Sequence, residues 1–299
     1  MLKQVQHDKK GEKMTKWYQV KEQSAGEKRL LLTWKIYKIF GKKAVQILAF
    51  FITFFAFLNA EEARRCSKKY LKIIGIKPSW LNQFRHFLEY SYSLVDRMEV
   101  FSGNFDYNKI IFDNKDDEKI FENGLFVICS HLGNIDIMRA FLDKYPEKRV
   151  NAFLSKEQCK IFNSFIKQIA VEKPVTTYPV EEIGIDTAIE IKDKLSSGEI
   201  VFMAGDRTSK NSTNSTIEFL KHKVQFPTGT FKFAEIMDCP IVFACALREH
   251  DKYRVYAEKF IPETKKCSEQ LRIEFVEFLE KHIPLAPLQF FHFYDMFED

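Results

Sequence analysis

The sequence LFVICSHLGNIDIMRAF, residues 125–141, joins an apolar run of strand length to a segment with helical spacing. Polar side chains stand at the junction, with His131 at its start. A continuous apolar run indicates a strand that is buried on both faces, as in a sheet covered by helices. In α/β folds, ligands bind where such a strand ends and a helix begins. This stretch therefore predicts an α/β fold and the edge of the sheet at which a ligand would bind.

The flanking sequence repeats the alternation of apolar strands and helices. Strands are predicted at VNAFLS (150–155), VTTYPV (175–180), EIVFMAG (199–205), PIVFACAL (240–247) and YRVYAEKF (253–260). Helices are predicted at 116–124, 134–145, 159–170, 184–198, 230–238 and 268–283. We therefore predict an α/β domain over residues 98–299, in which a mixed, mostly buried sheet is flanked by helices.

The junction after the first strand places a histidine near a carboxylate. His131 and Asp136 are five residues apart, so on a regular helix they would point about 140° away from each other. They can meet only if the chain bends between them, and Gly133 permits such a bend. A neutral imidazole could then act as a general base, with the carboxylate fixing its tautomer and Asn134 steadying a developing oxyanion. The alternative is that His131 and Asp136 merely cap the strand and the helix.

A second strand, in EIVFMAGDRTSK (199–210), also ends in polar residues. If the two strands lie in one sheet, Asp206 and Arg207 reach the same edge as His131. Arg207 could bind a phosphate or carboxylate group of a substrate, and Asp206 could position it. Lys156, which follows the strand at 150–155, could supply a further cation there. The alternatives are a surface ion pair in a turn and a solvated lysine.

Charge and hydropathy divide the N-terminal region from the rest. Residues 1–43 carry twelve Lys or Arg and four Asp or Glu, a net charge of +8, so the remainder of this +5 chain sums to −3. Residues 44–299 carry no excess of basic side chains, which argues against broad nucleic-acid binding. We predict a basic, disordered tail at 1–16 and a helical region at 17–97.

An uncharged segment, AVQILAFFITFFAFL, occupies residues 44–58. It is shorter than the roughly 20 residues that cross a bilayer as a helix. Lys42 and Lys43 precede it and Arg64 and Arg65 follow it, so their side chains could reach lipid head groups. We expect a helical, membrane-associating extension here, as a surface anchor or a partial insertion; the alternative is a buried core helix.

The sequence gives no sign of a metal site or a cofactor. The six cysteines and seven histidines lack ligand spacing, and Gly is sparse. A lipid esterase would need a serine in a G-x-S-x-G turn, and no such sequence is present around Ser130. We therefore predict neither metal nor cofactor.

Five segments in order along the chain resemble the lysophospholipid acyltransferase superfamily, in particular its late lipid A (lauroyl/myristoyl) acyltransferase branch. SHLGNID (130–136) is similar to that family's H-x-x-x-x-D/E motif, and GDRT (205–208) to its second block. The helix that follows the membrane anchor in that family is similar to EARRCSKKYL (62–71). A Gly-containing helix followed by a Pro-led strand is similar to FPTGTFKFAEIMDCPIVFACALRE (226–249), and an aromatic C-terminal tail is similar to LQFFHFYDMFED (288–299). The sequence departs from that branch in having Asp136 where many members have Glu, and GDR in place of a DQD-like block.

The resemblance implies an enzyme at the cytoplasmic face of the bacterial inner membrane. It implies an acyl donor carried as a thioester on acyl carrier protein or coenzyme A, and a lipid or glycolipid acceptor with a free hydroxyl or amine. It also implies His131 as general base and Asp136 as its partner. Two alternatives remain open at this point: a lipid esterase, and a non-catalytic membrane-binding protein on a degenerate acyltransferase scaffold.

Overall fold

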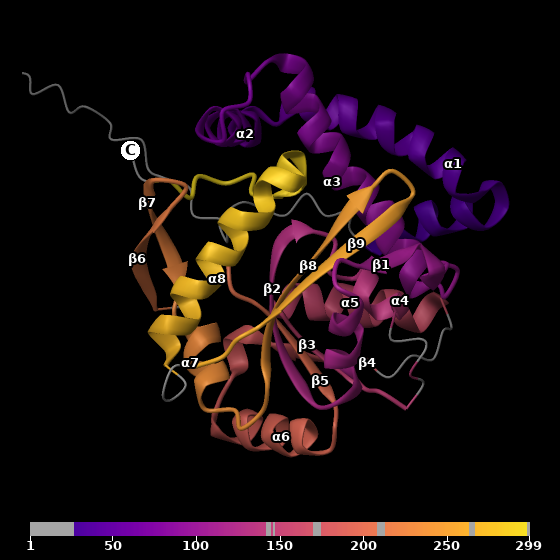
Figure 1. The fold of residues 1–299 in the computed structure, drawn as a ribbon. Helices are drawn as coiled ribbons and strands as arrows, with labels where there is room; N and C mark the ends of the chain where they lie inside the picture. Colours follow the sequence, from indigo (N-terminus) through magenta and orange to yellow (C-terminus); the bar gives the residue numbers. More distant parts are fainter. Residues whose placement is uncertain are drawn as a thin grey trace, which may run out of the picture.

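The fold is described from a computed structural model, which covers residues 27–141, 145, 147–169, 175–207, 213–262 and 267–297. The predicted tail at 1–16 lies outside these residues. Among the described residues, the N-terminal part consists of the three helices α1 (Glu27–Asn59), α2 (Glu61–Ile73) and α3 (Trp80–Phe101). They lie together at one end of the molecule (Figure 1).

The rest of the described chain forms an α/β unit around a seven-stranded mixed sheet. In spatial order the strands are β1 (Ile110–Phe112), β9 (Lys252–Lys259), β8 (Ile241–Glu249), β2 (Leu125–Gly133), β5 (Ile200–Ala204), β3 (Val150–Leu154) and β4 (Val175–Pro179). β8, β2, β5, β3 and β4 are mutually parallel, whereas β9 is antiparallel to β8. The predicted α/β fold with a mixed sheet is confirmed.

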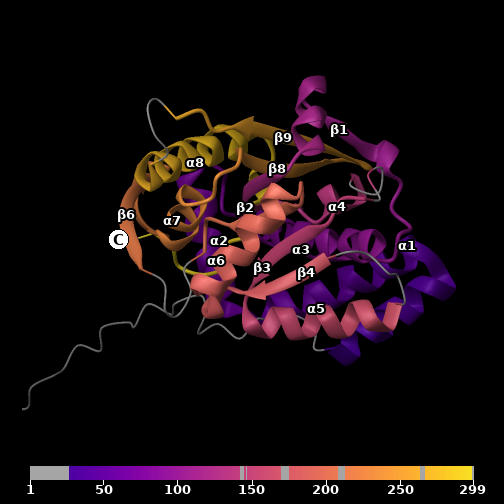
Figure 2. The same ribbon diagram turned by 90° about the horizontal axis from the view of Figure 1, so that it is seen from below.

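Helices cover both faces of the sheet, which explains why its central strands are apolar throughout. One face packs against α6 (Ile185–Ser196), α7 (Gly229–Glu235) and α8 (Ser268–His282). The other face packs against α3, α4 (Ile137–Phe141), α5 (Lys156–Ile169) and the 3-10 segment η3 (Lys115–Glu122). The two helical layers are seen on opposite sides of the sheet in Figure 2. All residues of β2 are buried except His131, which is half-buried.

Two elements differ from the sequence-based expectation. The helix expected from residue 134 begins only at Ile137, because residues 134–136 form a turn after β2. A two-stranded hairpin, β6 (Asn214–Phe219) and β7 (His222–Pro227), was not predicted. β6 has apolar side chains only at Ile217 and Phe219, so its period-2 signal in the sequence is short.

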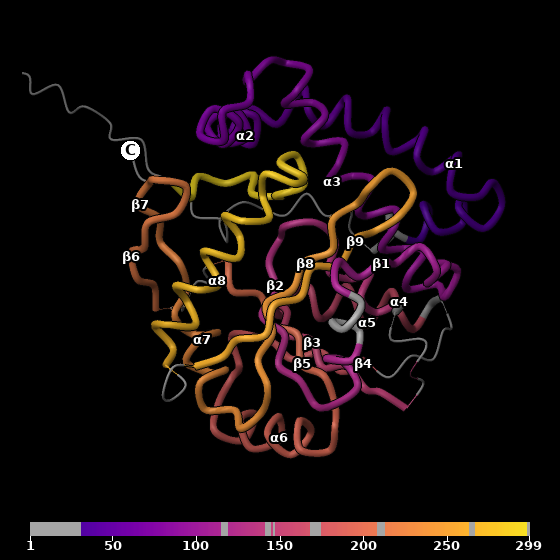
Figure 3. The backbone as a smooth tube through the Cα atoms, in the orientation of Figure 1, coloured from indigo at the N-terminus to yellow at the C-terminus, as the bar shows by residue number. Residues whose placement is uncertain are grey.

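The C-terminal residues form an irregular segment that packs against the end of β2. After η6 (Ile283–Leu285) and η7 (Pro287–Gln289), the chain runs between β2 and the helices α2 and α3 (Figure 3). It is held by the Tyr70 hydroxyl, which donates to the carbonyl of Pro287 at 2.8 Å, and by His86, whose Nε2 lies 2.9 Å from the carbonyl oxygen of Phe290. The N-terminal helices thus contact the segment that borders the predicted site.

α1 is the element most suited to a membrane. Over Leu31–Asn59 it is long and apolar enough to cross a bilayer, and only 11% of its most apolar stretch is buried against the protein. It bends at Gly41, whose φ of 74° and ψ of −177° are not helical. The predicted helical, membrane-associating extension therefore corresponds to α1, and most of residues 44–58 are not core.

Candidate active site

His131 is positioned by an irregularity at the end of β2. The pairing of β2 with β8 shifts register between Cys129 and Gly133. Gly133 has a φ of 72°, and a Cβ atom there would lie 2.1 Å from the carbonyl oxygen of Ala246. Only glycine fits so close to another backbone. The bend expected at Gly133 is therefore present, and it turns the His131 side chain out of an otherwise buried strand.

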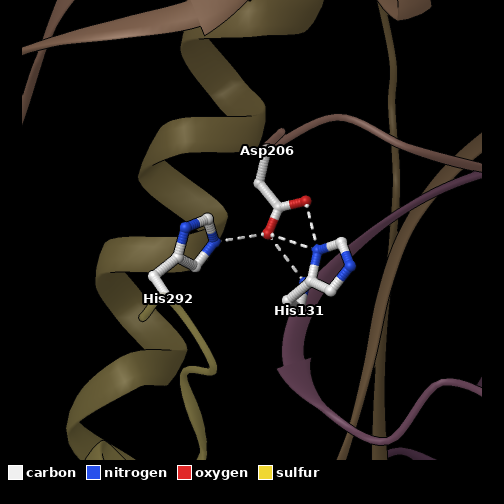
Figure 4. A group of neighbouring side chains, drawn as sticks. All are labelled: His131, Asp206 and His292. Carbon is white, nitrogen blue, oxygen red and sulfur yellow. Dashed lines mark hydrogen bonds and ion pairs between the residues drawn. The ribbon is translucent and has the colours of Figure 1, made fainter. Parts of the chain in front are cut away.

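Asp206 faces His131 from the neighbouring strand. It follows β5 by two residues, and β5 is the parallel partner of β2. The Asp206 carboxylate accepts the backbone N–H of His131 at 2.7 Å and lies 3.0 Å from its Nδ1. Its Oδ2 also lies 2.8 Å from Nε2 of His292. Figure 4 shows the carboxylate between the two imidazoles. We call His131, Asp206 and His292 the histidine cluster.

The hydrogen bonds of the histidine cluster fix its protonation. Burial alone would raise the pKa of Asp206, but the His131 and His292 side chains outweigh burial and hold the pKa well below its usual range. Asp206 is therefore an anion and an acceptor, so the nitrogen of each imidazole that faces it carries the proton. In the neutral form of His131, this leaves the lone pair on Nε2. The His131 side chain is 31% exposed, whereas Asp206 is fully buried.

His292 is a neutral imidazole at ordinary pH. Burial lowers its pKa to about 4, although the hydrogen bond to Asp206 and the charge of Asp206 act in the opposite direction. Its Nδ1 has no hydrogen-bond partner among the described residues. His292 thus donates one hydrogen bond to Asp206 without neutralising its charge.

The C-terminal segment builds one wall of the histidine cluster. The backbone N–H of Phe291 donates to the carbonyl of His131 at 2.9 Å, and Phe290 forms a bridge with Leu132. The Tyr294 hydroxyl donates to the carbonyl of Asp206 at 3.3 Å. The segment therefore fixes the backbone on both sides of the His131–Asp206 contact.

The predicted partner of His131 is corrected. Asp136 was expected to support the imidazole, but its Oδ2 forms an ion pair with Nε of Arg97 on α3, at 2.5 Å. The Nδ1 of His131 lies instead against Asp206, which the sequence had assigned to substrate positioning. The physical reason is the parallel pairing of β2 with β5, which brings Asp206 beside His131, whereas the turn after Gly133 brings Asp136 to α3.

The other predicted site residues, which were expected to contact substrate, form hydrogen bonds or ion pairs with other parts of the protein. The Asn134 side chain donates to the carbonyl of Ser93 at 2.9 Å, so the expected oxyanion role is replaced by a link to α3. Arg207 Nη2 donates to the carbonyl of Phe291 at 3.0 Å and thus holds the C-terminal segment. Lys156 is exposed and forms an ion pair with Glu182 at 2.6 Å, as expected for a surface lysine.

The sequence reasoning missed His292. The run LQFFHFYDMF contains one imidazole among seven apolar or aromatic residues, and an imidazole in such a setting is a signal for a buried role. Metal-ligand spacing, which requires residues close in sequence, does not reveal such a role. His292 is 86 residues from Asp206, so only the fold reveals the contact.

The three side chains are also close enough to hold a metal ion. One ligand atom from each of His131, Asp206 and His292 lies within 4.8 Å of the others. Their mutual distances of 2.8 and 3.0 Å match hydrogen bonds, however, and a metal bound at about 2.0–2.2 Å from each ligand would have to displace both imidazole protons. The donor set fits a hydrogen-bonded base better than a metal centre.

No protein-family model matches this chain, and no curated protein gives a significant sequence match.

Proposed function

We propose that this chain is an acyltransferase that moves a fatty acyl group from a thioester to a hydroxyl or amine of a lipid-like acceptor. The observation that carries the proposal is the contact between His131 and the buried anion Asp206 at the end of β2. The five segments that resemble the lysophospholipid acyltransferase superfamily support the same reaction and its late lipid A-like branch. The absence of a G-x-S-x-G turn argues against an esterase.

The geometry suggests a route for the proton. Nε2 of His131 takes the proton of the acceptor O–H or N–H while that oxygen or nitrogen attacks the thioester carbonyl. The imidazolium that forms is stabilised by Asp206, which stays ionised. When the tetrahedral intermediate collapses, the C–S bond breaks and the imidazolium returns the proton to the leaving thiolate. The products are an ester or amide and a free thiol, and no cofactor enters the balance.

His292 is a positioning residue in this scheme. Its hydrogen bond holds Asp206 from the side opposite His131, so the carboxylate can neither turn away nor take up a proton easily. The proposal also places the protein at the cytoplasmic face of the bacterial inner membrane, where a lipid acceptor and a soluble thioester meet. α1 supports the membrane part of this placement.

The test is an acyl-transfer assay followed by mass spectrometry. The purified full chain is incubated with lipid vesicles made from a total bacterial extract and with acyl carrier protein thioester or, separately, acyl-coenzyme A. We expect an acylated lipid with one carrier and loss of ~10²–10⁴-fold of the turnover in His131→Ala. Lipid extracts of cells with and without the protein identify the acceptor.

A matched control comes from another histidine. His250 is exposed in the turn between β8 and β9, with a φ of 60° that asparagine tolerates, so His250→Asn should retain full activity. Full activity of His131→Ala, or release of free fatty acid in place of an acylated lipid, would contradict the proposal.

A further inference from the structure

Polar side chains of α1 contact α3 at three positions between residues 37 and 53 of α1. Tyr37 donates to Glu99 at 3.2 Å, Lys42 pairs with Asp96 at 2.7 Å and Thr53 donates to Ser91 at 2.6 Å. As residue numbers rise along α1, those of its partners fall, so the two helices are antiparallel neighbours. α1 is therefore packed sideways on the protein over residues 37–53.

The second contact directly follows the bend at Gly41, and the third, between Thr53 and Ser91, lies inside the uncharged run at 44–58. Lys42 pairs with both Asp96 and Glu99 of α3. Asp96 also accepts a hydrogen bond from Tyr253 of β9, so this group ties α1 to the sheet. We call Lys42, Asp96, Glu99 and Tyr253 the helix cluster. If α1 crossed a membrane, α3 and the edge of the sheet would enter the hydrocarbon with it, at a high cost for their charges.

The opposite face of α1 is apolar and uncovered. Large apolar side chains of α1 are 44–72% exposed, among them Ile39, Phe40, Ile47, Phe51, Phe55 and Leu58. Trp80 and Leu81 at the start of α3 are also exposed, and Trp80 packs edge-on against Phe57 of α1. We call these eight residues the apolar face. Its members come from two neighbouring helices, whereas exposed apolar residues on an ordinary protein surface are scattered singly.

Basic side chains near the apolar face indicate which kind of surface it contacts. Lys35 and Lys43 are exposed on α1, one on each side of the bend at Gly41. α2 adds Arg65, Lys68 and Lys72, which share one exposed helical face at the same end of the molecule (Figure 1). Long basic side chains beside an apolar stripe match an anionic lipid surface, where their stems lie along the acyl chains and their charges reach the phosphates.

We propose that α1 lies in the plane of an anionic bilayer, with the apolar face inserted below the head groups, and does not cross it. The inference rests on the membrane association proposed above but not on acyl transfer. It places α2, α3 and the C-terminal segment that they hold next to the lipid, and the histidine cluster directly behind that segment.

The first experiment is vesicle flotation of the full chain with phosphatidylcholine vesicles that contain or lack phosphatidylglycerol. We expect binding to the anionic vesicles. The double variant Phe51→Asp/Phe55→Asp should weaken partitioning by about 100-fold or more, because two exposed aromatic side chains no longer enter the apolar layer. Ile185→Asp/Ile189→Asp is the matched control, since both are exposed apolar residues of α6 at the far end of the molecule.

The second experiment determines the side on which each end of α1 lies. Lys35→Cys and Asn59→Cys, each in a background with Cys239→Ser and Cys267→Ser, are exposed to a membrane-impermeant maleimide in sealed vesicles with the cytoplasmic face outward. An in-plane helix is labelled at both positions before detergent is added. If only Asn59→Cys is labelled before detergent is added, and Lys35→Cys reacts only afterwards, α1 crosses the bilayer and the proposal is overturned.

Two further outcomes are decisive. In the first, the unmodified protein sediments as a dimer, Phe51→Asp/Phe55→Asp sediments as a monomer, and neither protein binds vesicles. A second copy of the chain would then cover the apolar face, and the proposal would be wrong. Vesicle binding that persists unchanged in that variant would also reject it. If flotation and labelling hold but no acyl transfer is found with any lipid, the membrane inference stands and the proposed reaction falls.

Discussion

The histidine cluster and the helix cluster bury their polar groups in different ways. In the helix cluster, both carboxylates face the cation of Lys42, and Asp96 also accepts a hydrogen bond from Tyr253. In the histidine cluster, the anion Asp206 lies between two imidazoles, one of which is partly exposed. A proton that arrives at His131 is therefore stabilised by a charge already in place. The helix cluster thus holds helices together, whereas the histidine cluster has the geometry that the proposed proton transfer requires.

The largest expected effect comes from removing the anion. Asp206→Asn keeps the size of the side chain but no longer stabilises an imidazolium and can hold His131 in the wrong tautomer. We expect turnover in the acyl-transfer assay to fall by about 10³–10⁴-fold, with little change in circular dichroism or vesicle binding. Activity within a few-fold of the unmodified protein would remove the distinction between the two clusters.

The second effect is on stability as a function of pH. Burial lowers the pKa of His292 to about 4, and burial likewise lowers that of His86 to about 4. Both are near 6.5 when unfolded, so between pH 6.5 and 4 the unfolded chain binds more protons than the folded one. Stability is thus full above pH 6.5 and falls with pH below it, by about 3 kcal/mol for each imidazole at pH 4.

Denaturant unfolding in detergent from pH 7.5 to 4.5 measures this effect. His86→Gln should flatten the pH dependence, because glutamine can still donate to the carbonyl of Phe290 but does not titrate. An equally steep dependence in His86→Gln and His292→Gln would show that other groups are responsible.

The third effect tests the structural role of the helix cluster. Asp96→Asn removes a buried charge that faces Lys42 while the amide can still accept a hydrogen bond from Tyr253. We expect the free energy of unfolding to fall by about 2 kcal/mol, because Lys42 retains only Glu99. Turnover per folded molecule should be unchanged. A loss of turnover without a loss of stability would give this cluster a role in the reaction.

The smallest effect is expected at Asp136, the carboxylate that the sequence analysis predicted as the partner of His131. The ion pair between Asp136 and Arg97 is partly exposed, so Asp136→Asn should cost less than about 1 kcal/mol of stability. It should change kcat/KM by no more than about fivefold, in contrast to Asp206→Asn. A loss as large as that of Asp206→Asn would return Asp136 to the catalytic pair and show that its contact with Arg97 breaks during the reaction.

The sequence by itself determined the class of fold, because buried strands and amphipathic helices have periods that are visible in one dimension. β2, β5 and β8 are continuous apolar runs, and Gly133 marked the bend at the end of β2. His131 could be chosen for the same reason: it is a polar residue at the end of a buried strand. The uncharged run at 44–58 likewise identified α1 as the helix suited to a membrane.

Only the tertiary structure decided which groups meet. The carboxylate beside His131 is 75 residues away, and His292 is 86 residues beyond that carboxylate. These distances are bridged by the pairing of β2 with β5 and by the docking of the C-terminal segment, neither of which has a local signature. The orientation of α1 was also undetermined, because length and hydropathy do not reveal that Lys42 is turned toward α3. Contacts between distant segments depend on the packing of the whole chain, and a spacing of five residues, as between His131 and Asp136, is a poor guide to them.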